Sequence, residues 1–248
     1  MDAIVLLFAV PLLGFGEQTV APKVAPTGQA RLSGGPVVTC GSLPDGSNVH
    51  GDWGPSRKTF TINRPAEYPV LNSVTDNPYI GDERRFVGIK RDGSEQSWCS
   101  GMTATDGEAL LVRAYMENSA GENLNAPGAN DAQGVKLRFA LPEQAASLNQ
   151  IWGILNATNT NPMEIYGSVD VAADHPFRLD VIEGSARVEG NAARFNVGGP
   201  GTGMALPEDQ LFGAGTLLGY DVSNGVIPPT YEAALYATFR LRVTFVAN

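Results

Sequence analysis

The final segment, residues 231–247, constrains the fold of this chain more than any other feature. From Ala233 to Phe245 every second residue is apolar, and from Tyr236 onward the residues between them are tyrosine, threonine and arginine. Successive side chains of a strand point to opposite faces, so the pattern predicts a long strand with one buried and one hydrated face. Such a strand is typical of an antiparallel sheet that packs against a second layer. We therefore expect an all-β protein rather than an α/β enzyme.

Shorter alternating runs predict further strands, separated by turns rich in glycine and proline. These expected strands cover residues 58–63, 86–90, 109–117, 135–141, 165–171, 177–182, 186–189, 193–197 and 216–220. Together they predict an antiparallel β-sandwich of the immunoglobulin-like or Greek-key type over residues 58–248.

One segment has the apolar spacing of a helix rather than that of a strand. Residues 143–155 follow Pro142, a residue suited to a first helical turn, but Gly153 and the turn-forming cluster after it weaken a long helix. We expect at most a short helix near residues 143–148, followed by a strand from about 149 to 157.

The first 21 residues have features of an export signal. Ile4–Phe15 is an uninterrupted apolar run, too short to span a bilayer comfortably, and small residues follow it at Ala21 and Ala30. The basic residue expected before the run is missing, and Asp2 stands there, which leaves two interpretations: a truncated signal peptide or a buried strand. We favour the signal peptide, which predicts a secreted or cell-surface protein without a membrane span after cleavage. Residues 22–57 are rich in Pro, Gly, Ser and Thr and are predicted to be a linker or leading arm.

The chain has two cysteines, Cys40 and Cys99, and neither belongs to a Cys-x-x-Cys motif. Zinc binding and dithiol redox chemistry therefore have little support. In an oxidising compartment the natural prediction is a disulfide between them, and the alternative is two unpaired small apolar side chains. In the chain-entropy model such a bridge stabilises the fold by about 4 kcal/mol.

The charge balance limits the partners that the protein can have. The chain has 26 acidic and 17 basic residues and a net charge of −9. Such a charge repels phosphate backbones, so we expect no nucleic-acid partner. The partner itself is unknown, and an envelope protein, an extracellular protein or a glycan would be compatible with export.

Three phrases carry a resemblance to a known group of proteins: Trp53–Thr61, Asn72–Phe86 and Leu218–Pro228. With the strand at 112–118 and the last strand, they resemble, in this order, a group of uncharacterised exported bacterial proteins over roughly residues 53–247. These proteins are similar to the "conserved repeat" surface domains, which are immunoglobulin-like sandwiches. The resemblance implies a sandwich fold at the cell surface and no particular activity. The apolar N-terminal segment and the cysteine pair lie outside it.

The sharpest local motif is a loop with four oxygen-bearing side chains. Asp76, Asn77, Asp82 and Glu83 stand around a Pro-Tyr-Ile-Gly sequence, and carboxylate and amide oxygens are the ligands that calcium prefers. The alternative is a pair of turn-forming residues that shape the loop, with the acidic residues facing the neighbouring arginines. The loop is therefore a possible calcium site, and calcium is the one cofactor that the sequence suggests.

Other side chains that could act in catalysis or binding are not part of a recognisable motif. His50 and His175 lie in predicted loops without a nucleophile motif, so we assign no catalytic residue. Asp170, Asp174 and Asp180 are interpreted as solvated surface. Several aromatic residues would line a carbohydrate-binding face if they were exposed together, although core packing is the simpler interpretation. They are Trp53, Tyr68, Tyr79, Trp98, Trp152 and Tyr166.

Three functions follow from this interpretation, in order of preference. The first is a non-enzymatic secreted or cell-surface module with a structural or adhesive role. The second is a carbohydrate- or ligand-binding module of the same fold, which an exposed row of aromatic side chains would favour. The third is a hydrolase, which needs two carboxylates that face each other across a cleft.

Overall fold

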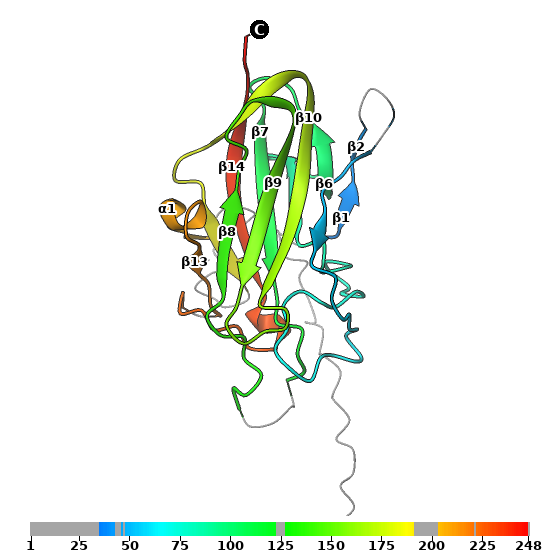
Figure 1. Ribbon diagram of the computed structural model, residues 1–248, viewed down its shortest axis with the longest axis vertical. Coiled ribbons are helices and arrows are strands. Elements are labelled where there is room, and N and C mark those ends of the chain that lie inside the picture. The colour runs from blue at the N-terminus through cyan, green and yellow to red at the C-terminus, as the bar shows by residue number, and fades with distance from the viewer. Residues whose placement is uncertain are drawn as a thin grey trace, which may run out of the picture.

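The computed structural model describes residues 35–42, 46, 48–122, 127–190, 203–220 and 222–247, and these residues are almost entirely β-structure (Figure 1). Their helical content is one turn of α-helix, α1 (Glu208–Leu211), and one 3-10 turn, η1 (Tyr231–Ala233). The predicted export signal, residues 1–21, and the predicted strand at 193–197 lie outside the described residues.

Five strands form a closed ring at the centre of the molecule. In order around the ring they are β14 (Leu235–Phe245), β7 (Ala109–Met116), β5 (Val87–Arg91), β6 (Trp98–Thr103) and β10 (Glu164–Val181). The pairing of β10 with β14 closes the ring, and β6 and β10 run parallel while the other four pairs are antiparallel. The architecture is therefore a mixed five-stranded β-barrel.

Strand β10 closes the barrel because it is long enough to pair with β6 at residues 170–172 and then with β14 from Phe177 to Val181. It also pairs with β9 (Ala146–Asn156) from Glu164 to Phe177. The register shifts between Ala172 and Phe177, where Pro176 is tolerated because the strand is irregular there. The sequence predicted two strands, at 165–171 and 177–182, and the structure has one continuous strand.

Further strands extend the barrel sheet on both sides. β8 (Lys136–Ala140) and β13 (Thr216–Leu217) follow β9, while β11 (Arg187–Gly190) and β12 (Met204–Ala205) follow β14. Phe239 of β14 and Phe139 of β8 pack edge to face with ring centroids 4.7 Å apart, so the apolar faces of these strands share one core.

The segment predicted as a leading arm contains four short strands. β1 (Val37–Thr39) runs parallel to β6, β2 (Gly41–Ser42) and β3 (Asn48–Val49) form a separate pair, and β4 (Trp53–Gly54) pairs with β10. The disulfide between Cys40 and Cys99 joins the end of β1 to β6 and confirms the predicted bridge. The division into an arm and a domain that begins at residue 58 stays a prediction.

The predicted antiparallel β-sandwich of the immunoglobulin-like or Greek-key type is wrong. The closed ring, together with the parallel pairs β6–β10 and β1–β6, overturns it. Alternation in a sequence indicates which side chains share a face, but it does not specify which strand lies alongside or in which direction. The all-β composition of the prediction was correct at this coarser level.

Two local predictions also differ from the structure. The short helix near 143–148 is absent, because Ala146–Asn156 is the strand β9, whose long ladder with β10 outweighs the helical spacing of its apolar residues. The predicted strand at 149–157 is confirmed apart from its bounds. The predicted strand at 58–63 is not regular, since Phe60 makes only an isolated bridge with Val74.

The outer face of the barrel is covered near the start of β14. The final strand was expected to have a hydrated face, yet Tyr236 and Thr238 are buried, as are Arg113 and Tyr115 on the neighbouring β7. Only further along, at Arg242, does this face of β14 become exposed. A second layer of loops therefore packs on the outside of the barrel, and it contains the candidate sites described next.

Candidate functional site

The four side chains of the predicted calcium site do not share one partner in the structure. Asp82 forms an ion pair with Arg84, with 2.5 Å between the carboxylate and the guanidinium, and Asp76 accepts a hydrogen bond from the Ile62 N–H at 2.8 Å. Burial opposes ionisation of Asp82, but the hydrogen bonds from Arg84 outweigh it and lower the pKa of that carboxyl. Asn77 and Glu83 instead lie together in the interior. The calcium site stays a prediction.

Glu83 is fully buried at the centre of a hydrogen-bond network. Its Oε1 accepts from Asn77 Nδ2 at 2.8 Å. Its Oε2 accepts from the Val74 N–H and from the Ser119 hydroxyl, each at 3.2 Å. These donors offset the loss of water around the carboxylate.

A second buried carboxylate, that of Glu117, belongs to the same network. The Tyr115 hydroxyl donates a short hydrogen bond to Glu117 Oε2, and Asn77 Nδ2 lies 3.2 Å from the Tyr115 hydroxyl and 3.4 Å from Glu117 Oε2. Burial, followed by the charges of Glu117 and Glu83, raises the pKa of Tyr115 well above its ordinary value. We call these four side chains (Asn77, Glu83, Tyr115 and Glu117) the buried network.

Asn72 fastens the loop that carries this network to the barrel. Its φ of 46° lies in the left-handed region, which asparagine tolerates better than most residues. Its Nδ2 donates to the Tyr115 carbonyl at 2.9 Å, and its Oδ1 accepts from the Glu117 N–H at 3.1 Å. Arg57 donates to the Asn72 carbonyl at 2.7 Å, and burial, with Arg84 nearby, lowers the pKa of Arg57 to about 10.

The sequence pattern conceals the buried network. Tyr115 and Glu117 alternate with apolar residues along the predicted strand 109–117, which is the pattern of a hydrated face. The signal that could have identified it is the Asn72–Phe86 phrase, which places Asn77 and Glu83 in one loop. Nothing in the sequence shows that this loop lies against β7.

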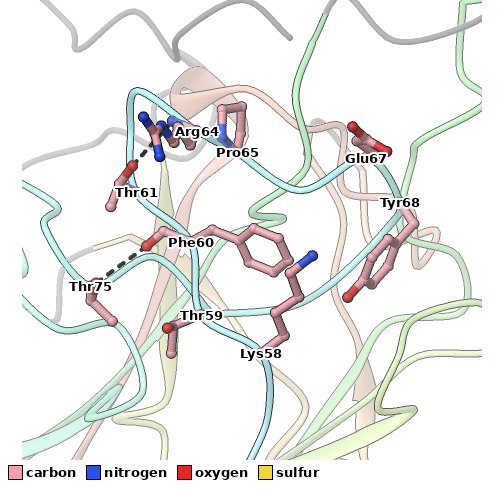
Figure 2. Close-up of a pocket in the computed structure, with 9 residues that line it drawn as sticks. All are labelled: Lys58, Thr59, Phe60, Thr61, Arg64, Pro65, Glu67, Tyr68 and Thr75. Carbon is pink, nitrogen blue, oxygen red and sulfur yellow. Dashed lines mark hydrogen bonds between the residues drawn. The ribbon is translucent and has the colours of Figure 1, made fainter. Parts of the chain in front are cut away.

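An open groove lies in the same region of the chain, in the loops that Figure 1 draws in cyan. Its volume is about 400 Å³. The lining residues, all drawn in Figure 2, are Lys58, Thr59, Phe60, Thr61, Arg64, Pro65, Glu67, Tyr68 and Thr75. We call it the 58–75 groove.

Two aromatic rings and a lysine define the middle of the 58–75 groove. The rings of Phe60 and Tyr68 meet edge to face with centroids 6.0 Å apart. The Lys58 ammonium lies 5.2 Å from the centroid of the Phe60 ring, and Figure 2 shows its side chain directed toward the space between the two rings. Such a distance is within the range of a cation–π contact.

The backbone of the 58–75 groove is held by hydrogen bonds. The Phe60 N–H donates to the Ser73 carbonyl at 2.9 Å, and the Phe60 carbonyl accepts from the Thr75 N–H at 3.0 Å. Thr61 and Arg64 exchange backbone hydrogen bonds at 3.3 and 3.0 Å. Beneath them, a small cluster of apolar side chains fills the interior: Phe60, Ala66, Val70 and Val74. The groove therefore has a fixed shape.

The aromatic side chains considered as a carbohydrate-binding face do not form one exposed row. Trp98 is buried between Lys90 and Arg113, whose charged groups lie 4.8 and 4.5 Å from its ring. Trp152 and Tyr166 pack edge to face at 5.6 Å on neighbouring strands. Tyr68, in the 58–75 groove, is partly exposed.

Trp53 and Tyr79 are also partly exposed. Trp53 is covered by the guanidinium of Arg84 at 4.3 Å. The Tyr79 N–H donates to Asn77 Oδ1 at 2.9 Å and its carbonyl accepts from the Gly35 N–H at 2.9 Å.

The histidines and the second acidic set lie elsewhere on the surface. His175 forms an exposed pair with Asp174 at 2.9 Å and stacks on Phe245. Burial raises the pKa of Asp170, a hydrogen bond from Gln150 opposes it, and Asp52 and His50 have smaller effects of opposite sign. The Ser168 hydroxyl accepts a hydrogen bond from the Asp52 N–H at 2.8 Å.

Comparisons with protein-family models, with curated proteins and with solved structures gave no significant match. Among the described residues, none of the helices has the length and apolar character needed to cross a bilayer. Inferences about function therefore rest on the geometry of the chain itself.

Proposed function

We propose that the protein is a non-enzymatic secreted or cell-surface module with an adhesive role, which contacts its target through the 58–75 groove. The observation that supports this best is the groove itself: an open site with a fixed backbone, two aromatic rings and an exposed lysine. Sites of this kind bind ligands through a few polar groups placed around an apolar floor.

The hydrolase alternative is less well supported because of where the carboxylates lie. Glycoside hydrolysis needs two carboxyl groups on either side of a substrate in a cleft. Glu83 and Glu117 come together through Asn77, but both are fully buried and their oxygens accept hydrogen bonds from the protein. A substrate could not reach them without disrupting the loop that contains Glu83.

The carbohydrate- or ligand-binding function is the second candidate, and the same groove favours it over a purely structural role. Phe60 and Pro65 are buried beneath the groove, while Lys58, Arg64 and Glu67 are exposed around it. An apolar floor with a charged rim is suited to a ligand that has one apolar face and several polar groups. The same groove would thus serve both functions, adhesion to a target and the binding of a ligand.

A glycan array tests this proposal. The protein should bind a defined subset of printed oligosaccharides, and Tyr68→Ala should abolish the signal because Tyr68 is the half-exposed ring of the groove. Tyr166→Ala is a matched control, since Tyr166 is also a half-exposed tyrosine but lies on β10. A signal that survives Tyr68→Ala, or that is absent for the wild type, would overturn the glycan-binding groove. Release of reducing ends from a bound oligosaccharide would overturn the non-enzymatic role.

A further inference from the structure

We propose that the 58–75 groove is specific for a carboxylate-bearing saccharide, with the Lys58 ammonium pairing with the carboxylate and Tyr68 packing against the sugar ring. This inference rests on the proposed function and names the class of ligand for the same site. Three features of the groove support it: its charge, its mixture of apolar and polar side chains, and the hydrogen bonds of its backbone.

The charge of the groove is opposite to that of the molecule. Its lining contains the cations Lys58 and Arg64 and the single acid Glu67, whereas the whole chain has a net charge of −9. Among the described residues, no carboxylate forms an ion pair with Lys58 or Arg64. An anion is therefore attracted here and repelled by most of the remaining surface.

Lys58 is suited to select an anion because its ammonium already contacts an aromatic ring. It lies over the Phe60 ring at 5.2 Å, and Phe60 is buried. A lysine held by a cation–π contact loses less conformational freedom when it pairs with a ligand than a fully mobile lysine does. Its ammonium is a compact point charge, so it can donate hydrogen bonds to a carboxylate from many directions.

The other lining groups match a sugar ring. A pyranose has an apolar face of C–H groups and a rim of hydroxyls, and the groove offers the Tyr68 ring for the former. For the latter it offers the hydroxyl of Thr59 and the carboxylate of Glu67, both exposed. Glu67 can accept hydrogen bonds from sugar hydroxyls. A ligand whose only polar groups are carboxylates has no such donors.

The backbone of the groove argues against an extended acidic peptide as the ligand. Peptides that add to a protein as a strand need unpaired N–H and C=O groups along an edge. Here the Phe60 N–H and C=O are bonded to Ser73 and Thr75, and Thr61 and Arg64 bond to each other. Around Phe60 the groove therefore lacks the free edge that strand addition needs, and we expect recognition through its side chains.

The experiment compares each acidic saccharide with its own methyl ester. Oligosaccharides that contain glucuronate, galacturonate or sialate, and the corresponding methyl esters, are titrated into the wild-type protein by isothermal calorimetry at low and at high NaCl. We expect at least one acid to bind about tenfold more tightly than its ester, corresponding to about 1.4 kcal/mol, and this advantage to shrink as salt screens the charges.

Two lysine variants assign that advantage to the groove. Lys58→Gln should remove the preference for the acid over the ester, because it removes the charge and keeps a long side chain. Lys136→Gln, at an exposed lysine of β8, should leave the preference unchanged. Both positions are exposed, so the unfolding midpoints of the variants should equal that of the wild type.

The outcomes separate this inference from the function on which it rests. If acid and ester bind equally, Lys58→Gln has no effect and Tyr68→Ala abolishes binding, the groove binds saccharides but the acidic specificity is overturned. If a hexaglutamate peptide binds through Lys58 and no saccharide does, the saccharide class is overturned. If no acid, ester or peptide binds, the inference fails together with the glycan-binding function.

Discussion

The loop region 58–83 supplies the whole 58–75 groove and, through Asn77 and Glu83, half of the buried network, and the two sites differ in their access to water. In the buried network, Glu83 and Glu117 are fully buried and their oxygens are met by Asn77 and Tyr115. In the groove, Lys58 is exposed and its ammonium lies over an aromatic ring. Charged residues of one loop region are thus used for stability in the first case and are available for binding in the second.

The difference has an energetic basis. A buried polar group that loses its partner retains the cost of leaving water, whereas an exposed group is simply hydrated again. Substitutions in the buried network should therefore change the free energy of unfolding strongly, and substitutions in the groove should change it little. The following predictions test that contrast.

The largest effect is expected from Glu83→Ala. This change leaves the Val74 N–H and the Ser119 hydroxyl without their buried acceptor and should lower the free energy of unfolding by about 4 kcal/mol. Urea denaturation followed by tryptophan fluorescence measures it. The control is Glu67→Ala in the groove, an exposed carboxylate, for which we expect a change within about 0.5 kcal/mol. Equal losses for the two variants would show that the contrast is not real.

A smaller loss is expected from Tyr115→Phe, which keeps the packing of the ring against Tyr236 and removes the hydroxyl. Glu117 then loses a buried donor and Asn77 loses one of its acceptors, so the free energy of unfolding should fall by about 2 kcal/mol. The same denaturation experiment measures this value. A variant as stable as the wild type would mean that water replaces the hydroxyl in the network.

The contribution of Tyr115 should depend on alkaline pH. Its pKa is raised well above 10.0 in the folded protein, so the folded state keeps a proton that the unfolded state releases above about pH 10. The stability that this hydroxyl provides is therefore complete below the unfolded pKa and is lost as the pH rises above it. The difference in unfolding free energy between wild type and Tyr115→Phe should be constant near neutral pH and should shrink above pH 10. A difference that grows with pH would contradict the burial of a neutral tyrosine.

The smallest effect on stability is expected in the groove. Lys58→Gln should change the free energy of unfolding by less than about 0.5 kcal/mol, because the ammonium is exposed and its contact with the Phe60 ring is a weak cation–π interaction. Thermal unfolding of the variant beside the wild type is sufficient to check this. A clear destabilisation would place Lys58 with the structural residues and weaken the case for a binding role.

Most strands could be predicted from the sequence, while their arrangement could not. The alternation at 109–117 and in the final strand identified β7 and β14 because period-two patterning follows directly from strand geometry. The parallel pairing of β6 with β10, and the closure of β10 onto β14, depend on contacts between distant segments. The same patterns would suit either a sandwich or a barrel.

Only some residues of the buried network and of the 58–75 groove could be recognised in the sequence. Asp76, Asn77, Asp82 and Glu83 were selected together as a loop, yet only Asn77 and Glu83 reach the interior, where they meet Tyr115 and Glu117. Which of the four side chains are buried depends on the segments that pack over them, and not on their neighbours in sequence. Tyr68 was considered only as one of several aromatic side chains, and only the fold of residues 58–75 brings it into one groove with Lys58.

The sequence by itself determined that the protein is built from strands and which residues of most strands are apolar, because these properties are local. It also favoured the pairing of Cys40 with Cys99, since the chain has no other cysteines. Tertiary structure alone decided the barrel, the direction of its strands and which polar side chains lose contact with water. These features depend on segments far apart in the chain, and the free energy of burying a carboxylate or exposing a lysine is set by everything that surrounds it.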